Sequence, residues 1–162
     1  MGARHLAAGF AAVTPPPLPV VLLLGATGFI GQRLLEALRA AGHEVVCGMR
    51  STHTISGCRS IAVDYTRDQA PADWMQRLSG IDVVINAVGI LRETKSASFE
   101  ALHVHAPVAL FTACAQIGVK VVQISALGAD VHAASGYHLS KKRADDRSDE
   151  PDTLPRTGLA WV

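Results

Sequence analysis

One short segment restricts the fold of this chain more than any other. The aliphatic run Val20–Leu24 leads directly into the glycine-rich turn Gly25–Gly31, and a segment with helical spacing, Phe29–Ala41, follows. An unbroken apolar strand is typical of a parallel sheet that is covered on both faces, because neither face meets water. The segment therefore predicts a buried strand, a tight turn and a helix packed back onto the sheet.

The helix after the turn is amphipathic, and its end is marked. Its apolar residues share one face, and they are Ile30, Leu34, Leu35 and Leu38. Gly42 supplies the stop, since glycine readily adopts the left-handed conformation that ends a helix. A second helix is predicted over Ala101–Gln116.

Short aliphatic runs alternate with helical segments along the rest of the chain. The predicted strands are Val20–Leu24, Glu44–Met49, Ser60–Val63, Asp82–Ala87, Val119–Ile124 and a last one that starts near Thr157. A repeated βαβ order predicts an α/β fold, a doubly wound parallel sheet with right-handed crossovers.

Charge and hydropathy exclude several classes of protein. With 15 basic and 14 acidic side chains, the formal charge is +1, which gives no electrostatic basis for binding nucleic acid. The basic run Lys141–Arg143 precedes Asp145 and Asp146, as in a solvated helix face. A hydrophobic fraction of 49% excludes a disordered chain, and no apolar stretch reaches the roughly 18 residues that span a bilayer. We expect a globular protein with no nucleic-acid partner and no direct membrane span.

The cysteines indicate a reducing compartment. Cys47, Cys58 and Cys114 are odd in number, widely spaced and form no C-x-x-C pair, so neither a disulfide framework nor a zinc site is supported. Residues 1–18, which include three consecutive prolines, are predicted to be a flexible leader rather than a secretion signal. We therefore expect a cytoplasmic protein with free thiols.

The three glycines of the turn predict a phosphate site. Gly25 allows a tight turn, Gly28 lets backbone N–H groups approach a pyrophosphate, and Gly31 permits close packing of the helix on the strand. The N-terminus of the helix adds its partial positive charge. A purely structural glycine turn is the alternative, but the position between a buried strand and an amphipathic helix favours dinucleotide binding.

A family resemblance extends this prediction. The spacing G-x-x-G-x-x-G in GATGFIG resembles the cofactor turn of the extended and atypical short-chain dehydrogenase/reductase superfamily, with its epimerase/dehydratase-like members. The segment Ile124–Ala129 is most similar to atypical members related to the nucleotide-binding accessory subunit of mitochondrial complex I. The resemblance covers about residues 20–150. It implies a Rossmann-type sheet in three layers, α/β/α, and an NAD(P)-binding oxidoreductase or epimerase-like protein.

The resemblance also implies which residues hold the cofactor. Asp64 resembles the residue that hydrogen-bonds the adenine amino group, and Asn86–Gly89 resembles a segment that lines the cofactor. Taken singly, Asp64 could cap a strand end and Asn86 could be a turn residue, but their order after the glycine turn favours the cofactor roles. The full predicted set is Gly25, Thr27, Gly28, Phe29, Ile30, Gly31, Arg50, Asp64, Tyr65, Asn86, Ala87, Val88, Gly89 and Lys141.

The end of the second predicted strand indicates which nicotinamide cofactor is bound. An acidic residue there would accept a hydrogen bond from the ribose 2′-OH of NAD, whereas an arginine would neutralise the 2′-phosphate of NADP. This strand ends in Arg50, followed by Ser51 and Thr52, with no carboxylate. We expect NADP, with NAD as the alternative if Arg50 is an ordinary loop charge.

A candidate catalytic group lies near the C-terminus. Tyr137 and Lys141 form Y-x-x-x-K, which on a helix places both side chains on the same face. A phenol ordinarily titrates at about pH 10, so acid/base work near neutrality needs a nearby cation such as Lys141. Ser125, at the end of the fifth predicted strand, can hydrogen-bond the substrate oxygen that exchanges the proton. By resemblance, these three are the superfamily's catalytic Ser, Tyr and Lys.

One departure from the superfamily points to a different function. Extended members usually carry an asparagine in an N-V-x-G-T stretch, where this chain has His103–Pro107. A non-catalytic NADP(H)-binding module for redox sensing or complex assembly is therefore the alternative to an enzyme. On a helix, His103 and His105 point about 200° apart, so we expect no metal site, and predict one packed and one solvated histidine.

The end of the chain bears on the domain organisation. In the superfamily, the region after the sixth strand builds most of the substrate pocket, and this chain ends at Gly158–Val162, where that strand begins. We expect residues 19–162 to form an NAD(P)-binding Rossmann domain with an incomplete sixth strand and no C-terminal substrate region. The substrate is expected to be an unidentified small molecule. Marginal stability, or a partner chain that covers the truncated edge, is expected to follow.

Overall fold

The computed structural model describes residues 16–50, 54–148 and 159–161. Its elements are β1 (Val21–Leu24), α1 (Phe29–Ala40), β2 (Val45–Met49), β3 (Arg59–Ala62), α2 (Pro71–Met75), β4 (Val83–Asn86), the π-helix η1 (Glu100–His105), α3 (Ala106–Ile117), β5 (Lys120–Gln123), α4 (Gly136–Ser148) and β6 (Leu159–Trp161). Most of the predicted leader, residues 1–15, lies outside the described residues, as do Ser51, Thr52 and Thr157.

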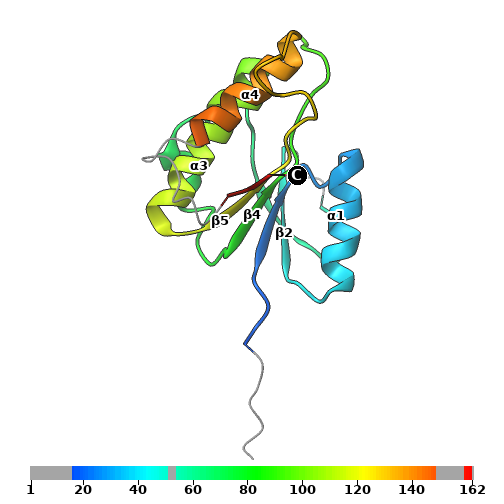
Figure 1. Cartoon of the computed structure of the whole chain (residues 1–162). Coiled ribbons are helices and arrows are strands. Elements are labelled where there is room, and N and C mark those ends of the chain that lie inside the picture. Colours follow the sequence, from blue (N-terminus) through cyan, green and yellow to red (C-terminus); the bar gives the residue numbers. More distant parts are fainter. Residues whose placement is uncertain (1–15, 51–53, 149–158, 162) are drawn as a thin grey trace, which may run out of the picture.

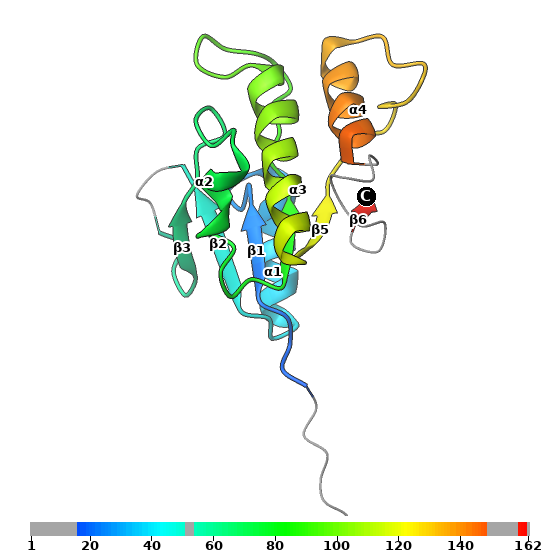
Figure 2. The same cartoon turned by 90° about the vertical axis from the view of Figure 1, so that its left-hand side faces the viewer.

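The described strands form one parallel sheet. Their order is β3-β2-β1-β4-β5-β6 (Figure 2). At the centre, Val21 of β1 is level with Val45 of β2 on one side and Val83 of β4 on the other. Helix α1 covers one face of the sheet, and α3 and α4 lie on the other (Figure 1). The predicted α/β fold, a Rossmann-type doubly wound parallel sheet in three layers, is thus confirmed.

Each face of the sheet has its own apolar core, because the apolar strands bury side chains on both sides. Beneath α1, Leu23 and Cys47 of the sheet pack with Leu35 of the helix. On the opposite face, the strands pack against Trp74 of α2 and Phe111 of α3, both fully buried. The helices are therefore held at defined positions over the strands.

Helix α1 keeps most of its predicted features. It is followed by Gly42, whose φ of +85° lies in the left-handed region that ends a helix. Leu35 is buried, but the prediction that Ile30 shares the packed face is wrong, since its side chain is 49% exposed. Ile30 lies in the first turn of α1, beside the glycine turn that follows β1, whereas Leu35 lies further along the helix and packs with Leu23 and Cys47 of the sheet.

The second predicted helix consists of two elements. Residues Glu100–His105 form the π-helix η1, and α3 begins at Ala106. Pro107 lies in the first turn of α3 and has no N–H to donate to the carbonyl groups of η1, which runs directly into α3. Because π-helical turns are rare and often occur at functional sites, η1 is a candidate part of a functional site.

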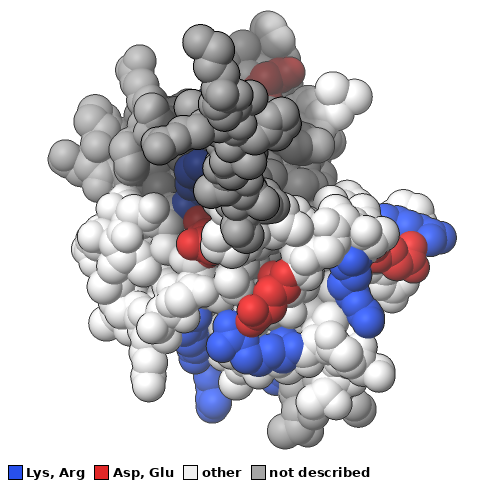
Figure 3. All heavy atoms as spheres, turned by 90° about the horizontal axis from the view of Figure 1, so that it is seen from below, with Lys and Arg blue, Asp and Glu red and all other residues white. Residues whose placement is uncertain are grey.

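The edge of the sheet where the strands begin carries mixed charge. Seen from below, lysine and arginine side chains lie beside aspartate and glutamate side chains (Figure 3). This interspersed pattern agrees with the formal charge of +1. Among the described helices, none combines the length and apolarity needed to cross a bilayer.

Candidate functional site

The strand order creates a crevice at the carboxyl ends of the strands. After β1 the chain goes to β2 on one side, and it later crosses to β4 on the other side, so the loops after β1 and β4 diverge there. A cavity of about 630 Å³ lies at this position. The predicted cofactor residues that line it are Gly25, Thr27, Gly28, Arg50, Asp64, Tyr65, Ala87, Val88 and Gly89.

Other residues, not predicted from the sequence, complete the wall of the cavity. Gly48, Met49 and Thr66 lie beside predicted residues at the ends of β2 and β3, and Ile90 follows the predicted Asn86–Gly89 segment. Leu102 reaches the cavity from η1. Sequence neighbours of predicted residues could have been included, but no local signal marks Leu102, because only the packing of η1 brings it there.

The glycine turn is built for close approach. Gly25 has a φ of +83°, and a Cβ there would lie 2.8 Å from the carbonyl carbon of Ala87. A Cβ on Gly31 would lie 1.9 Å from the carbonyl oxygen of Gly25. The N-terminus of α1, at Gly28, has no side-chain cap, so its first N–H groups are left for an anion. A side chain at Gly25 would push the turn away from the segment after β4, and one at Gly31 would force the turn and the helix apart.

The remaining predicted cofactor residues do not line the cavity. Phe29 and Ile30 project from the start of α1 and are 88% and 49% exposed. Gly31 packs beneath Gly25, and the Asn86 side chain is fully buried behind the wall. Lys141 reaches the wall from α4. Direct cofactor contacts by these residues remain predictions.

One end of the cavity carries charged side chains. The Thr66 hydroxyl donates to Asp64 Oδ1 at 2.7 Å, and this hydrogen bond, together with the nearby Arg67 and Arg50, holds the pKa of Asp64 below its usual value. Asp64 lies two residues beyond β3 rather than at its end. An ionised carboxylate there can accept a hydrogen bond, and Arg50 brings a positive charge to the same end.

Asn86 acts behind the wall. Its Oδ1 accepts hydrogen bonds from the Tyr65 hydroxyl at 2.7 Å and from the Val88 N–H at 3.2 Å. Its Nδ2 donates to Gln123 Oε1 at 2.7 Å, and Gln123 in turn donates to the Ile124 carbonyl. The oxygen and the nitrogen of the Asn86 side-chain amide are therefore both hydrogen-bonded within the protein. These hydrogen bonds hold the segments after β4 and β5 in place.

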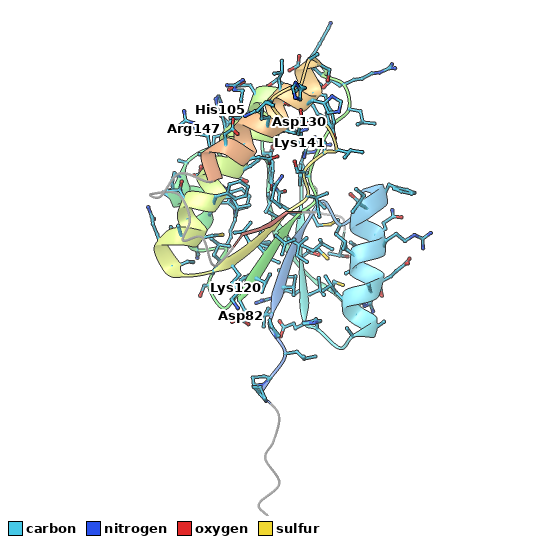
Figure 4. The ribbon with its side chains drawn as sticks, viewed as in Figure 1. Asp82, His105, Lys120, Asp130, Lys141 and Arg147 are labelled. Atoms are coloured by element: carbon cyan, nitrogen blue, oxygen red, sulfur yellow. The ribbon has the colours of Figure 1, made fainter. Side chains whose placement is uncertain are left out.

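Lys141 is a buried cation at the other end of the crevice. Lys141 is only 4% exposed, and its Nζ donates to the carbonyl oxygens of Ile124 at 3.2 Å and Val88 at 3.4 Å. Burial lowers its pKa, and the nearby Asp145 opposes that shift. In Figure 4, Lys141 lies on the side of α4 that faces the strand ends. The Asn86–Gln123 pair is hydrogen-bonded to both residues, Val88 and Ile124, whose carbonyl oxygens hold this ammonium.

Tyr137 and Ser125 differ in what surrounds them. Tyr137 lies one turn before Lys141 on α4, half-buried, and its ring packs edge-on against His103 with centroids 5.5 Å apart. Ser125 donates its hydroxyl proton to Asp145 Oδ2, also on α4. The structure thus brings Tyr137 and Lys141 together on one helix, while the Ser125 hydroxyl is directed to a carboxylate.

His103 is packed and His105 is solvated, as predicted. The residue His103 is 1% exposed, whereas the His105 side chain is 51% exposed and lies 3.2 Å from Glu100. Burial, with the nearby charge of Lys141, lowers the pKa of His103 from 6.5 to about 4. Within residues 16–50, 54–148 and 159–161, no three His, Cys, Asp or Glu side chains form a group that could hold a metal ion.

The buried imidazole makes stability depend on pH. The unfolded chain takes up a proton on His103 below its ordinary pKa of 6.5, and the folded protein does so only at about 4. This contribution is therefore fully present above pH 6.5 and is lost as the pH falls towards 4. Between about pH 7 and about pH 5, we expect His103 to lower the free energy of unfolding by about 2 kcal/mol. Urea unfolding across this range should show the loss, and His103→Phe should reduce the slope; an equal slope would contradict the assignment.

A second cavity has a different character. It measures about 680 Å³ and lies between α2, η1, α3 and α4, away from the strand ends. Its charged lining is internally paired: Glu100 accepts two hydrogen bonds from Arg143, each of 2.7 Å, and lies beside His105. Nine of the predicted site residues line the first cavity, and none of them lines this one. We therefore assign the functional site to the crevice at the strand ends.

The residues of the crevice fit a dinucleotide. The glycine turn leaves a cradle that a Cβ would fill, and the N-terminus of α1 faces it without a side-chain cap. The polar groups are divided between the two ends, with Asp64 and Arg50 after β3 and β2, and Lys141 beyond β4. A long ligand with phosphates at its centre matches this layout.

Known proteins resemble this chain. It is 28% identical over 136 residues to NADH dehydrogenase [ubiquinone] 1 alpha subcomplex subunit 9, mitochondrial, of Arabidopsis thaliana, with 78% of this chain and 34% of that protein covered. It is 27% identical over 139 residues to the ceramide reductase of Caulobacter vibrioides, with 83% and 44% covered. The chain thus spans less than half the length of these two curated relatives.

Solved structures and a family model agree with the fold. The Bordetella bronchiseptica enzyme WbmH in complex with NAD+ superposes with a TM-score of 0.70 at 17% identity, covering 90% of this chain and 56% of that one. The model of the NAD dependent epimerase/dehydratase family matches residues 21–147. This match includes the glycine turn, the walls of the crevice and α4 up to Arg147. The chain belongs to the NAD-dependent epimerase/dehydratase family.

Proposed function

We propose that this chain is the dinucleotide-binding part of an NAD(P)-dependent oxidoreductase or epimerase-like enzyme acting on a small-molecule substrate. The observation that carries the proposal is the crevice itself, where the glycine turn, Asp64 and the segment after β4 converge. Family membership supports binding of a nicotinamide dinucleotide. One relative supports redox chemistry by name, the ceramide reductase of Caulobacter vibrioides.

NADP(H) is the proposed cofactor. Arg50 lines the cavity at the end of β2, next to the position where the adenine ribose would lie. Its charge also contributes to the lowered pKa of Asp64, and both residues line the same cavity. A 2′-phosphate would meet Arg50 there, whereas NAD has only a hydroxyl group at that position.

The residues of α4 have distinct proposed roles. The bound nicotinamide would donate or accept a hydride at a carbonyl or alcohol carbon. Tyr137 is the proposed acid/base, giving a proton to the substrate oxygen or taking one from it. Lys141, held by two carbonyl oxygens, would favour the ionised form of Tyr137 and bind the nicotinamide ribose. Ser125 would bind the substrate oxygen once its bond to Asp145 gives way.

A second candidate function rests on that same serine. Because Ser125 donates its proton to Asp145, its hydroxyl cannot at the same time donate to a substrate carbonyl. A non-catalytic NADP(H)-binding module for redox sensing or complex assembly would need no such donation. The similarity to a subunit of a plant NADH dehydrogenase favours this alternative.

The proposal also includes the cellular compartment of the protein. The three cysteines are free in the structure, two of them buried. Free thiols are usual in the reducing cytoplasm, which is the location we propose. One relative is mitochondrial by name, so fractionation of cells expressing the tagged chain, with a mitochondrial marker, would distinguish the two compartments.

Titration with NADPH and NADH tests the cofactor assignment. The wild type should bind NADPH more tightly, and Arg50→Gln should weaken NADPH binding about tenfold while leaving NADH within about twofold, because one charge-assisted contact is lost. Gly28→Glu should weaken both by about 100-fold, since a carboxylate then faces the phosphates. Calorimetry would measure both, with Arg33→Gln, an exposed arginine paired to Glu36, as the control.

Two results would contradict the assignment. Equal or tighter binding of NADH by the wild type would remove the role of Arg50 as a phosphate ligand. Unchanged binding by a folded Gly28→Glu variant would show that the nucleotide does not use the glycine turn.

A further inference from the structure

His103 occupies a central place beside the crevice. It lies in η1, and its ring joins two segments that are far apart in the sequence. Nε2 lies 3.0 Å from the Ile90 nitrogen, in the loop after β4, and Nδ1 lies 2.8 Å from Ser140 Oγ in α4. Ile90 lines the cavity, and Ser140 is the neighbour of Lys141. The imidazole is therefore a bridge between a wall of the crevice and the helix that carries the candidate catalytic side chains.

The hydrogen bonds of this bridge have only one consistent direction. A backbone N–H can only donate, so Nε2 accepts from Ile90 and carries no proton. The ring proton then lies on Nδ1, which donates to Ser140 Oγ. Ser140 completes the chain by donating its own proton to the Tyr137 carbonyl at 2.7 Å. Both ring nitrogens are used, so the ring serves as an anchor and not as a proton carrier.

Packing ties the ring to the same groups. Phe99 stacks on it with centroids 5.2 Å apart, and the Tyr137 ring meets it edge-on at 5.5 Å. A methyl group at Gly89 would lie 3.5 Å from His103 Nε2 and 3.4 Å from Lys141 Nζ, so imidazole and ammonium meet over this glycine. From α4, the titratable groups that face the ring are Tyr137 and Lys141, with Asp145 next to Lys141.

A protonated ring would break this arrangement. It would place a second cation beside the Lys141 ammonium, and Nε2 would present a proton to the Ile90 N–H instead of a lone pair. The site is therefore complete only with a neutral imidazole in the Nδ1–H form. Asparagine, which the superfamily pattern has at this position, is shorter and reaches only about as far as Nδ1, so one amide could not span both partners.

We propose that His103 is a positioning residue for the nicotinamide end of the cofactor site, a role that rests on the proposed function. Through Ile90 and Ser140, it sets the distance between the loop Val88–Ile90 and the face of α4 that bears Tyr137 and Lys141. The adenosine end, at Asp64 and Arg50, lies across the sheet and does not depend on it.

Three substitutions test the two hydrogen bonds of the His103 bridge separately. His103→Gln keeps an acceptor near Nε2 for Ile90, His103→Asn keeps a partner near Nδ1 for Ser140, and His103→Phe keeps only the ring packing. His105→Gln is the matched control, because this histidine lies in the same π-helix but points away from the site (Figure 4).

Binding of two probes measures the effect at each end of the site. NADPH reports on the whole site, and the fluorescence of its nicotinamide reports on that end alone; adenosine 2′,5′-bisphosphate reports on the adenosine end. We expect His103→Phe to weaken NADPH binding about tenfold and to shift the emission of the bound nicotinamide towards that of free NADPH. Bisphosphate binding should stay within about twofold. Gln and Asn should each restore part of the NADPH affinity, and His105→Gln should match the wild type.

The outcomes are distinct. If all three His103 variants bind NADPH like the wild type, or if both probes weaken equally, the inference is wrong while the proposed function stands. If the wild type binds neither NADPH nor NADH, the proposed function fails and this inference with it. Nitrogen NMR of the wild-type imidazole gives a test without substitution: the Nδ1–H form above about pH 5 is expected, and an Nε2–H form would overturn the bridge.

Discussion

Replacing Gly31 with alanine is expected to lower the free energy of unfolding by about 3 kcal/mol or more. The new Cβ would lie 1.9 Å from the Gly25 carbonyl oxygen and 2.7 Å from its carbonyl carbon. Both are backbone atoms, so a change of side-chain rotamer cannot relieve the clash, and α1 would have to move away from the glycine turn. The movement would also separate Leu35 from the core beneath α1. Urea unfolding, followed by far-UV circular dichroism, would measure the loss.

Gly28→Ala is the matched control for that variant. Gly28 lies in the same turn with a φ of −77°, and a Cβ there would meet only the Gly25 carbonyl oxygen, at 3.3 Å. We expect a loss of about 1 kcal/mol or less. If Gly31→Ala were as stable as Gly28→Ala, the close approach of helix and turn would not hold in solution.

Replacing Tyr137 with phenylalanine is expected to reduce turnover about 100-fold to 10,000-fold, because the phenolic proton is the proposed acid. The ring would remain, and with it the packing against His103 and Phe99. NADPH affinity should therefore change less than about threefold. NADPH oxidation with a panel of aldehydes and ketones would measure turnover, and calorimetry would measure binding.

Lys141→Met extends the test, with Lys142→Met as its control. Lys141 is buried against two carbonyl oxygens, whereas Lys142 pairs with Asp146 on the outer side of α4. We expect Lys141→Met to lose both turnover and part of the NADPH affinity, and Lys142→Met to keep both. A wild type that binds NADPH but turns over no carbonyl compound would favour the binding module, and a Tyr137→Phe variant with full activity would exclude Tyr137 as the acid.

The glycine turn and its neighbours show which parts of the structure the local sequence pattern can predict. An aliphatic run, a G-x-x-G-x-x-G turn and an amphipathic segment are consecutive in the chain, so their chemistry predicted β1, the turn and α1 together. Ile30 shows where such reasoning stops. Helical periodicity assigned it to the packed face, but burial also depends on which strands the helix covers, and Ile30, in the first turn of α1, is 49% exposed.

For the polar residues too, the sequence predicted the residue's chemistry and the packing decided its partner. Asn86 was predicted as part of the cofactor wall, and the structure uses its side chain to join β3, β4 and β5 from behind that wall. Ser125 was predicted to face a substrate, and it donates to Asp145. In both cases the residue type indicated hydrogen bonding, while the partner was decided by how the elements pack together, which the sequence pattern does not specify.

From its sequence alone, this chain was determined to be a doubly wound α/β domain with a phosphate-binding turn after its first strand, because strands, turns and helix ends depend on neighbouring residues. Only the tertiary structure decided the partners of the buried polar side chains. Asn86 meets Gln123, and His103 meets Ser140, each 37 residues away. Such pairs depend on the order of the strands in the sheet and on the packing of α4 against η1, which no local spacing specifies.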